Sequence, residues 1–290
     1  MTSNQSQSTN QKKTNTLFDI DIESDRKLLL PIMLLSIVII GSFLLPYIYT
    51  TSPFTFDANS ILQSPSISHI FGTDRLGRDI FARILLGTQT SIIIGLFSAL
   101  IATFTGLVIG ISAGYFKGNI DKSIVIIIDL FLTFPTFFLL LALVSYIDAS
   151  NIILIIVISI TGWMGTARLI RSESFAISNQ PFIKILKISK VSSSKIILKY
   201  FAPLLAPIFL VSFTFGVGGA ILAESGLSFL GLGINAPDMS LGSLLSSGKA
   251  VLDIAWWVSF FPGLILFIIT FSLMQISDTL QSKFNQKDII

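Results

Sequence analysis

Six long apolar runs, separated by shorter polar segments, dominate the pattern of side chains along this 290-residue chain. About 20 consecutive apolar residues allow an α-helix to cross a hydrocarbon core of roughly 30 Å. Because backbone inside a bilayer must satisfy its own hydrogen bonds, such runs indicate helices. The pattern therefore predicts an all-α, polytopic membrane protein with six transmembrane helices, at residues 28–47, 91–114, 123–146, 151–167, 203–223 and 256–276.

The polar segments divide the chain further. Residues 1–27 are rich in Ser, Thr, Asn and Gln and then turn acidic, which predicts a disordered tail. The apolar run in residues 28–50 is longer than a signal-peptide core and has no clear cleavage site, so we expect a retained first transmembrane helix. Residues 51–90 mix prolines with charges of both signs, which favours a loop with a short interfacial helix lying flat before the second span. Residues 91–280 hold the other five spans, and residues 281–290 form a second tail.

Positive charge is distributed unevenly among these segments. Fifteen of the 19 Lys and Arg residues lie in the two tails, between the second and third spans, or between the fourth and fifth spans. Cytoplasmic segments of membrane proteins carry such an excess, so both termini and the loop at residues 168–203 are predicted to be cytoplasmic. Residues 51–90 are then external, and there Asp79 and Arg83 have the spacing of an ion pair on one helix face.

Composition excludes several classes of protein. The chain is 52% hydrophobic and 12% charged, with a mean hydropathy of +0.82, which does not suit a soluble domain of this length. It has no cysteine and a single histidine, His69, so we expect no thiolate or histidine-rich metal site within it. The nearest approach to a nucleotide-binding loop, residues 242–250, has Ala250 where a hydroxyl residue is needed. We therefore predict no catalytic residue, no metal site and no cofactor bound by this chain.

Glycine and proline mark two features of the spans. Gly106, Gly110 and Gly114 recur at intervals of four residues in the second span and share one helix face. Small residues at this spacing let two membrane helices approach closely, so we expect a helix–helix contact within the chain or with another subunit. Pro135 predicts a kink in the third span.

Two acidic residues in or near the spans are candidates for the translocation path or its gate. Glu224 lies in a glycine-rich stretch, residues 216–233, that includes Gly218 and Gly219. We expect these glycines to permit a broken helix, which a membrane tolerates only where protein or a water-filled cavity covers the backbone. Glu224, Gly218 and Gly219 are the preferred gate candidates. Asp129, in the third span, is expected to make a structural polar contact, with a place in the path as the alternative.

The segment between the fourth and fifth spans differs from its surroundings, because residues 180–207 carry five lysines and no acid. On a helical wheel most apolar residues fall on one side and the lysines on the other, with Ile183 and Val191 breaking the pattern. The serines at 192–194 offer an elbow and an N-cap for a second short helix. An amphipathic helix resting on anionic lipid would explain the lysines, whereas a docking surface for a cytoplasmic protein also explains the elbow and the length. The residues assigned to that contact are Phe182, Ile183, Lys184, Ile185, Leu186, Lys187, Lys190 and Pro203.

Several stretches, in the same order, resemble the permease subunits of ABC importers for dipeptides, oligopeptides and nickel, specifically the second permease of the pair. They are HIFGTDRLGRDIFARILLGTQTS, AGYFKGNIDK, TGWMGTARLIRSE, GGAILAESGLSFLGLGINAPDMSLGSLL, WWVSFFPGLILFI and ISDTLQ. The resemblance extends over about residues 28–281. It implies the type I ABC importer permease fold.

The resemblance also implies partners and a location. A member of this family is a multi-pass protein of the bacterial cell membrane, surrounded by membrane lipids, and pairs with a second, homologous permease. Two cytoplasmic ATPase subunits hold the ATP and Mg. An extracellular binding protein, lipid-anchored or periplasmic, delivers the solute. No nucleic-acid partner is implied.

In that family the basic segment corresponds to the coupling helices, which sit in a groove of the ATPase and follow roughly the pattern E-A-A-x-x-x-G. Phe182 takes the usual aromatic position and Pro203 the closing proline. Lys184 stands where the family has Glu, an Ile-Leu pair replaces the two alanines, and Lys190 stands where it has Gly. Because of these departures, the turn that glycine usually makes is not expected with certainty here. They suggest that the ATPase groove is acidic or roomy. In that case, replacing Lys184 and Lys187 with Glu would uncouple transport.

The sequence thus predicts the membrane-spanning permease of an ATP-driven importer. Its solute is a di- or oligopeptide, or nickel or another metal chelated by a small metallophore. One alternative is a secondary transporter or channel working alone, which would predict inverted repeats or a relay of intramembrane charges. A second alternative is a non-transporting assembly subunit, which the degenerate coupling motif favours.

Overall fold

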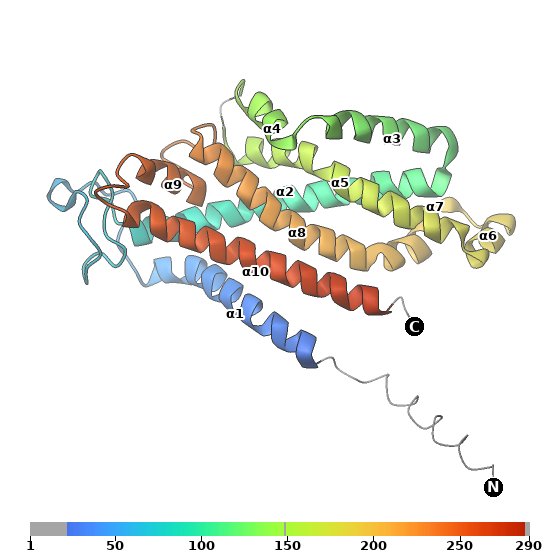
Figure 1. The fold of residues 1–290 in the computed structure, drawn as a ribbon, viewed down its shortest axis with the longest axis horizontal. Coiled ribbons are helices and arrows are strands. Elements are labelled where there is room, and N and C mark those ends of the chain that lie inside the picture. Colours follow the sequence, from blue (N-terminus) through green and yellow to red (C-terminus); the bar gives the residue numbers. More distant parts are fainter. Residues whose placement is uncertain (1–21, 148, 288–290) are drawn as a thin grey trace, which may run out of the picture.

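The computed structural model describes residues 22–147 and 149–287, which form long helices that run side by side (Figure 1). Among these residues five helices are long and apolar enough to cross a membrane, and a bent pair of helices adds a sixth crossing if it counts as one span. The single helices are α1 (Ile22–Leu44), α2 (Ile80–Phe116), α5 (Asn151–Asn179), α8 (Ala202–Phe229) and α10 (Trp257–Lys287). The bent pair is α3 (Gly118–Thr133) and α4 (Thr136–Val144). The predicted all-α membrane protein is thus confirmed, with five or six candidate spans in the described residues.

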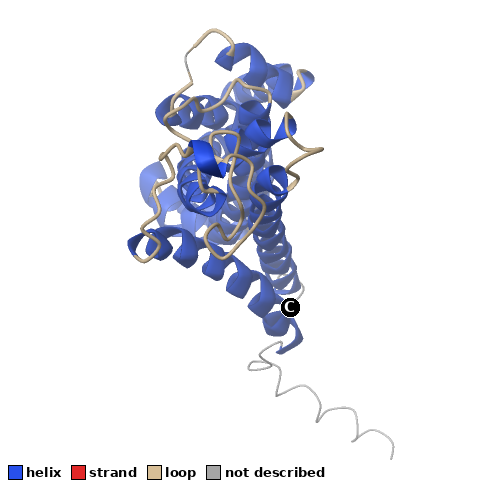
Figure 2. Ribbon diagram, turned by 90° about the vertical axis from the view of Figure 1, so that its left-hand side faces the viewer, coloured by secondary structure: helices blue, strands red, loops and turns tan. Residues whose placement is uncertain are grey.

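Shorter elements lie at the two ends of this bundle. Helices α6 (Pro181–Ile188) and α7 (Ser193–Ile196), followed by a π-helical turn (Ile197–Phe201), connect α5 to α8 at one end. The N-terminal end of α1 and the C-terminal end of α10 point toward that same end (Figure 1). Helix α9 (Leu241–Lys249) and the loops that precede α2 lie at the opposite end, which Figure 2 shows facing the viewer. Two 3-10 turns, Leu45–Tyr47 and Ala58–Ser60, interrupt the chain between α1 and α2.

Side-chain caps fix where several helices begin. The Asp79 carboxylate accepts a hydrogen bond of 2.8 Å from the backbone N–H of Ala82 and so caps α2. Ser150 caps α5 in the same way, and Ser240 and Ser243 form a reciprocal capping box at the start of α9. Each cap satisfies backbone donors that have no partner within the helix.

Helix α2 is the centre of the bundle. It packs along most of α5 and against α8, while α10 packs against α8, α9 and α1. Near the loops that precede α2, buried apolar side chains of α2, α8, α9 and α10 form one cluster that includes Ile84, Ile221, Leu244 and Val258. Apolar side chains elsewhere, such as Ile126 on α3, remain exposed on the outer faces of the helices. Lipid tails or partner helices would cover such surfaces in a membrane.

Two sequence-based expectations about the backbone are wrong. α2 begins at Ile80 and continues to Phe116, so no separate interfacial helix precedes the second span within the described part of residues 51–90. The glycine-rich part of α8 is continuous helix up to Phe229, so the expected break at Glu224 is absent there. The kink predicted at Pro135 is confirmed, because the axes of α3 and α4 differ by 81° there. Proline has no backbone N–H, and its ring clashes with the preceding turn. Glycine keeps its N–H and can therefore remain within a regular helix.

Candidate functional site

The basic segment forms two short helices joined by an elbow, as the sequence predicts. α6 ends at Ile188, and the backbone N–H of Val191 donates to Leu186 O over 3.1 Å in the turn that follows. α7 then begins after Ser192, whose side chain makes no capping hydrogen bond, so the predicted side-chain N-cap is wrong. The elbow therefore lies between the two helices, at the end of the molecule where α2 and α5 also end (Figure 1).

Ile183 anchors α6 on the rest of the protein. Its side chain is fully buried and belongs to a cluster with Tyr115 of α2, Ile170 of α5 and the equally buried Ile196 and Phe201. The helical wheel placed Ile183 outside the apolar stripe, because the wheel could not show that α6 rests on the ends of α2 and α5 through its other side. Ile183, one of the two residues that break the sequence pattern, thus holds the segment in place.

A second apolar face of α6 points away from the protein. Phe182, Ile185 and Ile188 are 41%, 62% and 79% exposed, and we call these three residues the α6 face. Exposing three large apolar side chains on an eight-residue helix is unfavourable in water unless another surface covers them. The α6 face therefore has the properties of a docking surface.

The lysines of the segment are not equivalent. Lys184 and Lys187 are both exposed, but the Lys187 ammonium lies 4.1 Å from the centre of the Tyr115 ring and 3.3 Å from Ser178 Oγ. Partial burial, together with the nearby positive charge of Lys117, holds the pKa of Lys187 below its ordinary value. Lys187 thus ties α6 to α2 and α5, while the exposed Lys184 and Lys190 remain available to a partner.

Lys190 keeps the turn for which the family uses glycine. Its backbone φ is +56°, in the left-handed region, which follows directly on the end of α6. A side chain with a Cβ atom disfavours this region by about 1–2 kcal/mol, so glycine is the usual choice. The elbow forms with lysine in place of glycine. The backbone bond from Val191 to Leu186 closes the turn, and the buried Ile183 anchors α6 before it.

Lys190→Gly is expected to stabilise the chain by about 1 kcal/mol, because it relieves the left-handed conformation at the expense of some added freedom in the unfolded state. Thermal unfolding of the purified protein measures this effect. Ser189→Gly is the matched control, since Ser189 has an ordinary φ of −73° and should not gain stability. An unfolding midpoint for Lys190→Gly at or below that of Ser189→Gly would contradict the expectation.

Glu224 lies inside the protein among hydroxyl groups. Its side chain is fully buried, and Ser91, Ser225 and Ser228 donate hydrogen bonds of 3.2, 3.3 and 2.6 Å to its carboxylate. Ser91 Oγ also accepts a bond of 3.1 Å from the backbone N–H of Leu241, the first residue of α9. Glu224 therefore links α8 to α2 and α9, and a role in gating stays a prediction.

The two glycines beside Glu224 face different surroundings. A Cβ atom on Gly218 would lie 3.7 Å from Leu273 Cβ, in ordinary contact with α10. A Cβ atom on Gly219 would meet nothing within 4 Å, because Gly219 borders a cavity of about 190 Å³ between α2, α4, α5 and α8. The cavity is lined by small side chains and by hydroxyls from Ser98, Thr103, Thr136, Thr161, Thr166 and Ser212. Sequence reasoning missed these hydroxyl residues, because they come from four helices and form no local motif.

Asp129 makes a contact between helices. Its carboxylate accepts a hydrogen bond from the Arg168 guanidinium, and both side chains are more than half exposed. One turn further along α5, Arg171 binds both carboxylate oxygens of Asp121, near the start of α3. The two pairs hold α3 against α5.

Gly106, Gly110 and Gly114 lie where α2 touches α5. A Cβ atom on each would come within 2.5–2.8 Å of an α5 atom, closer than real Cβ contacts. The nearest atoms belong to Thr166, Ile170 and Ser174, so the contact is within the chain. The spacing of four residues therefore places all three glycines on one face of α2 against successive turns of α5.

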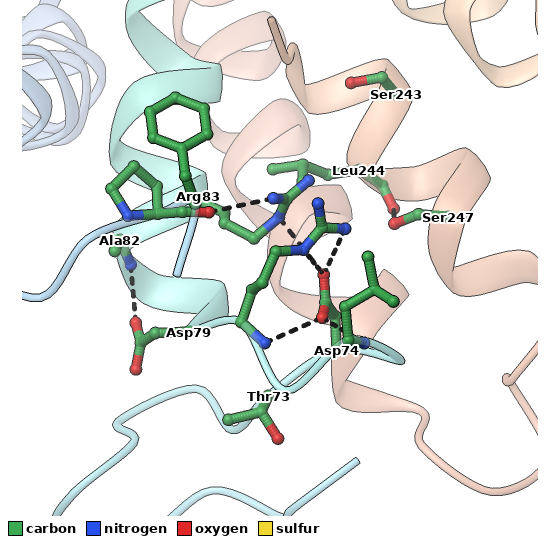
Figure 3. A network of polar contacts seen from close by, with 12 residues as sticks. Thr73, Asp74, Asp79, Ala82, Arg83, Ser243, Leu244 and Ser247 are labelled. Atoms are coloured by element: carbon green, nitrogen blue, oxygen red, sulfur yellow. Dashed lines mark hydrogen bonds and ion pairs between the residues drawn. The ribbon is translucent and has the colours of Figure 1, made fainter. Parts of the chain in front are cut away.

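A polar network folds the loop that precedes α2 (Figure 3). Asp74 accepts a bond of 2.8 Å from Arg78 Nε, and Arg83 Nε lies 3.6 Å from the same carboxylate. Asp79 does not pair with Arg83, so that predicted ion pair is wrong. Asp79 instead caps α2 and lies 2.9 Å from His69 Nδ1. The chain's single histidine thus belongs to the anchoring of this loop.

Comparison with known proteins places these features in a family. The family model for the "binding-protein-dependent transport system inner membrane component" matches residues 106–287. The oligopeptide transport system permease protein OppC of Mycobacterium tuberculosis is 38% identical over 229 residues, covering 78% of this chain and 77% of the relative. The dipeptide transport system permease protein DppC of Alkalihalophilus pseudofirmus is 34% identical over 260 residues, covering 88% of this chain and 85% of the relative.

Among solved structures, an inward-facing conformation of the MetNI methionine ABC transporter shares the fold, with a TM-score of 0.55 at 13% identity. The match covers 69% of this chain and 97% of the other. At this identity the likeness concerns the fold alone. The family model and the relatives confirm the resemblance seen in the sequence: this chain belongs to the family of binding-protein-dependent transport system inner membrane components, the permeases of ABC transporters.

Proposed function

We propose that this chain is one permease subunit of an ATP-driven importer in a bacterial cell membrane, and that its cargo is a di- or oligopeptide. The observation that carries the proposal is the set of relatives at 31–38% identity over three quarters or more of the chain, each named as a permease of an oligopeptide or dipeptide transport system. These names favour a peptide over nickel or a metal chelate.

Coupling to ATP would occur through the α6 face. Its three apolar side chains are exposed at the end of the molecule toward which the N-terminal end of α1 and the C-terminal end of α10 point, the end that the distribution of Lys and Arg assigns to the cytoplasm. Two partner ATPases would bind ATP and Mg, this chain would bind no cofactor, and a second homologous permease would complete the membrane domain. An extracellular binding protein would deliver the peptide at the opposite end, near α9 and the loop anchored by Asp74.

The proposal is tested by isolating the chain from its native membrane with whatever subunits accompany it. We expect ATPase subunits and a second permease to co-purify, and the complex in liposomes to take up a labelled alanine tripeptide only when ATP and the binding protein are present. Uptake by the isolated chain without an ATPase would support a secondary transporter instead. A complex that hydrolyses ATP and moves no peptide would contradict the proposed cargo.

A further inference from the structure

Two lysines converge where α2 and α5 end. Lys187 of α6 donates hydrogen bonds of 3.4 Å to the backbone oxygen of Tyr115 and 3.3 Å to Ser178 Oγ. Lys117, between α2 and α3, donates a bond of 2.7 Å to Oδ1 of Asn179, the residue after Ser178. The positive charge of Lys117 is close enough to contribute to the lowered pKa of Lys187. The fold therefore holds two ammonium groups that repel each other near one another, and we call them the lysine pair.

No acidic side chain balances the lysine pair. Within the described part of the chain, the two ammonium groups contact only neutral oxygens and aromatic rings. Asp121, one turn after Lys117, is bound through both carboxylate oxygens by Arg171. The helix ends supply little negative charge either, because the C-termini of α2 and α5 are followed at once by the N-termini of α3 and α6, whose dipoles have the opposite sign. The unbalanced positive charge is expected to attract an anion.

The surroundings of Lys117 indicate which anion is present. Lys117 lies between two spans, and the apolar side chains of Phe116 and Ile120 on either side of it are 52% and 47% exposed. Beside a membrane, such side chains lie among the lipid tails while the lysine reaches the level of the headgroups. The lysine pair and α6 lie at the same end of the bundle (Figure 1). Basic pockets at the ends of membrane helices bind the headgroups of anionic lipids.

From these observations we infer that Lys117 and Lys187 bind the phosphate of an anionic lipid in the membrane leaflet nearest α6. A lipid phosphodiester carries one negative charge and two free oxygens, so it can accept hydrogen bonds from both ammonium groups. Inorganic phosphate offers the same oxygens but has no tail to cover Phe116 and Ile120, which favours the lipid. The bound lipid would connect α6 to the junction of α2 and α3. The inference concerns a lipid and does not depend on the proposed cargo.

The first test measures which lipid the protein retains. The chain is purified with its accompanying subunits in micelles that contain equal amounts of phosphatidylglycerol and phosphatidylcholine, and native mass spectrometry counts the bound lipids. We expect an excess of phosphatidylglycerol on the wild-type protein. Each lysine near an anionic lipid strengthens binding about fivefold, so replacing both Lys117 and Lys187 with Gln should lower this excess about thirtyfold. A wild-type protein without any preference for phosphatidylglycerol would overturn the inference.

Two further variants control for net charge and for folding. Replacing Lys122 and Lys184 with Gln removes the same charge at the same end of the bundle, but both side chains are exposed and make no hydrogen bond or ion pair within the described residues. This variant should keep the excess of phosphatidylglycerol, and an equal loss in the two Gln variants would overturn the site. Replacing Lys117 and Lys187 with Arg keeps both charges and should also keep the excess. A loss in the Arg variant as large as in the Gln variant would mean that charge is not what holds the lipid.

A second measurement distinguishes the possible sources of the anion. Phosphatidylglycerol added to phosphatidylcholine micelles is expected to raise the thermal unfolding midpoint of the wild-type protein, because a ligand that binds only the folded state stabilises it. Inorganic phosphate at the same concentration should leave the midpoint unchanged. An equal rise with inorganic phosphate would show that the site takes a free anion and would overturn the lipid. If the Lys117 and Lys187 Gln variant keeps its phosphatidylglycerol and instead loses its ATPase subunits, the lysine pair contacts a protein and the inference is wrong.

Discussion

Replacing Ile185 and Ile188 together with aspartate is expected to abolish ATP-driven uptake while leaving the permease folded. Both side chains are mostly exposed, at 62% and 79%, so the change removes little packing within the chain. If an ATPase covers the α6 face, two unpaired charges must lose their water on docking, at about 3 kcal/mol each. The affinity of the ATPase should then fall about ten-thousandfold. Co-purification of the ATPase subunits and ATP hydrolysis in the reconstituted complex measure this directly.

Ile254→Asp is the matched control for that experiment. Ile254 is 72% exposed but lies beside α9, at the opposite end of the molecule, so the ATPase should remain bound. Reversing the charge of one lysine at a time then distinguishes the effect of charge from that of the α6 face. Lys184→Glu alters only an exposed side chain, whereas Lys187→Glu also breaks the contacts with Tyr115 and Ser178. Retention of the ATPase by the double aspartate variant would show that the α6 face is not the coupling surface.

The sequence predicted those parts of the fold that depend on local composition. Apolar length located the spans, because that signal acts over one helix. The serines at 192–194 placed the elbow only approximately: the turn follows Ile188, and Ser192 precedes α7 without a capping bond from its side chain. The face shared by Gly106, Gly110 and Gly114 followed from helical geometry, although their partner on α5 did not. Helix extents were less accurate: α2 and α5 continue well beyond their apolar cores, since polar residues stay helical where tertiary packing supports them.

The errors concern contacts between distant segments. Asp79 was paired with Arg83 from spacing alone, but Asp74 competes for the arginine and the α2 amides compete for Asp79. Ile183 broke the helical wheel because the buried side of α6 is set by α2 and α5. The hydroxyls of the cavity converge from four helices, so no window of sequence contains their pattern. Sites assembled from side chains far apart in the chain require the tertiary structure.

Gly110→Leu is expected to prevent normal packing of α2 on α5 and to destabilise the protein by about 3 kcal/mol. The Cβ atom alone would lie 2.7 Å from Ile170 Cβ and 2.8 Å from the backbone oxygen of Ala167. Because one of these atoms belongs to the α5 backbone, a change of rotamer cannot relieve the clash, and the helices must separate. The change should also move the Ile170 cluster that anchors Ile183, and thus displace the α6 face.

Gly110→Ala and Gly165→Ala are expected to change the stability of the protein in opposite directions. In an open helical site Gly→Ala stabilises by about 1 kcal/mol, since alanine favours the helix, and Gly165→Ala should show this because nothing lies within 4 Å of its Cβ position. Gly110→Ala carries the same propensity gain but meets the α5 backbone, so its effect should be destabilising. Thermal unfolding of the two purified variants compares them directly. A stabilised Gly110→Ala would mean that α2 and α5 lie further apart than the glycine contact requires, and the anchoring of α6 would then need another source.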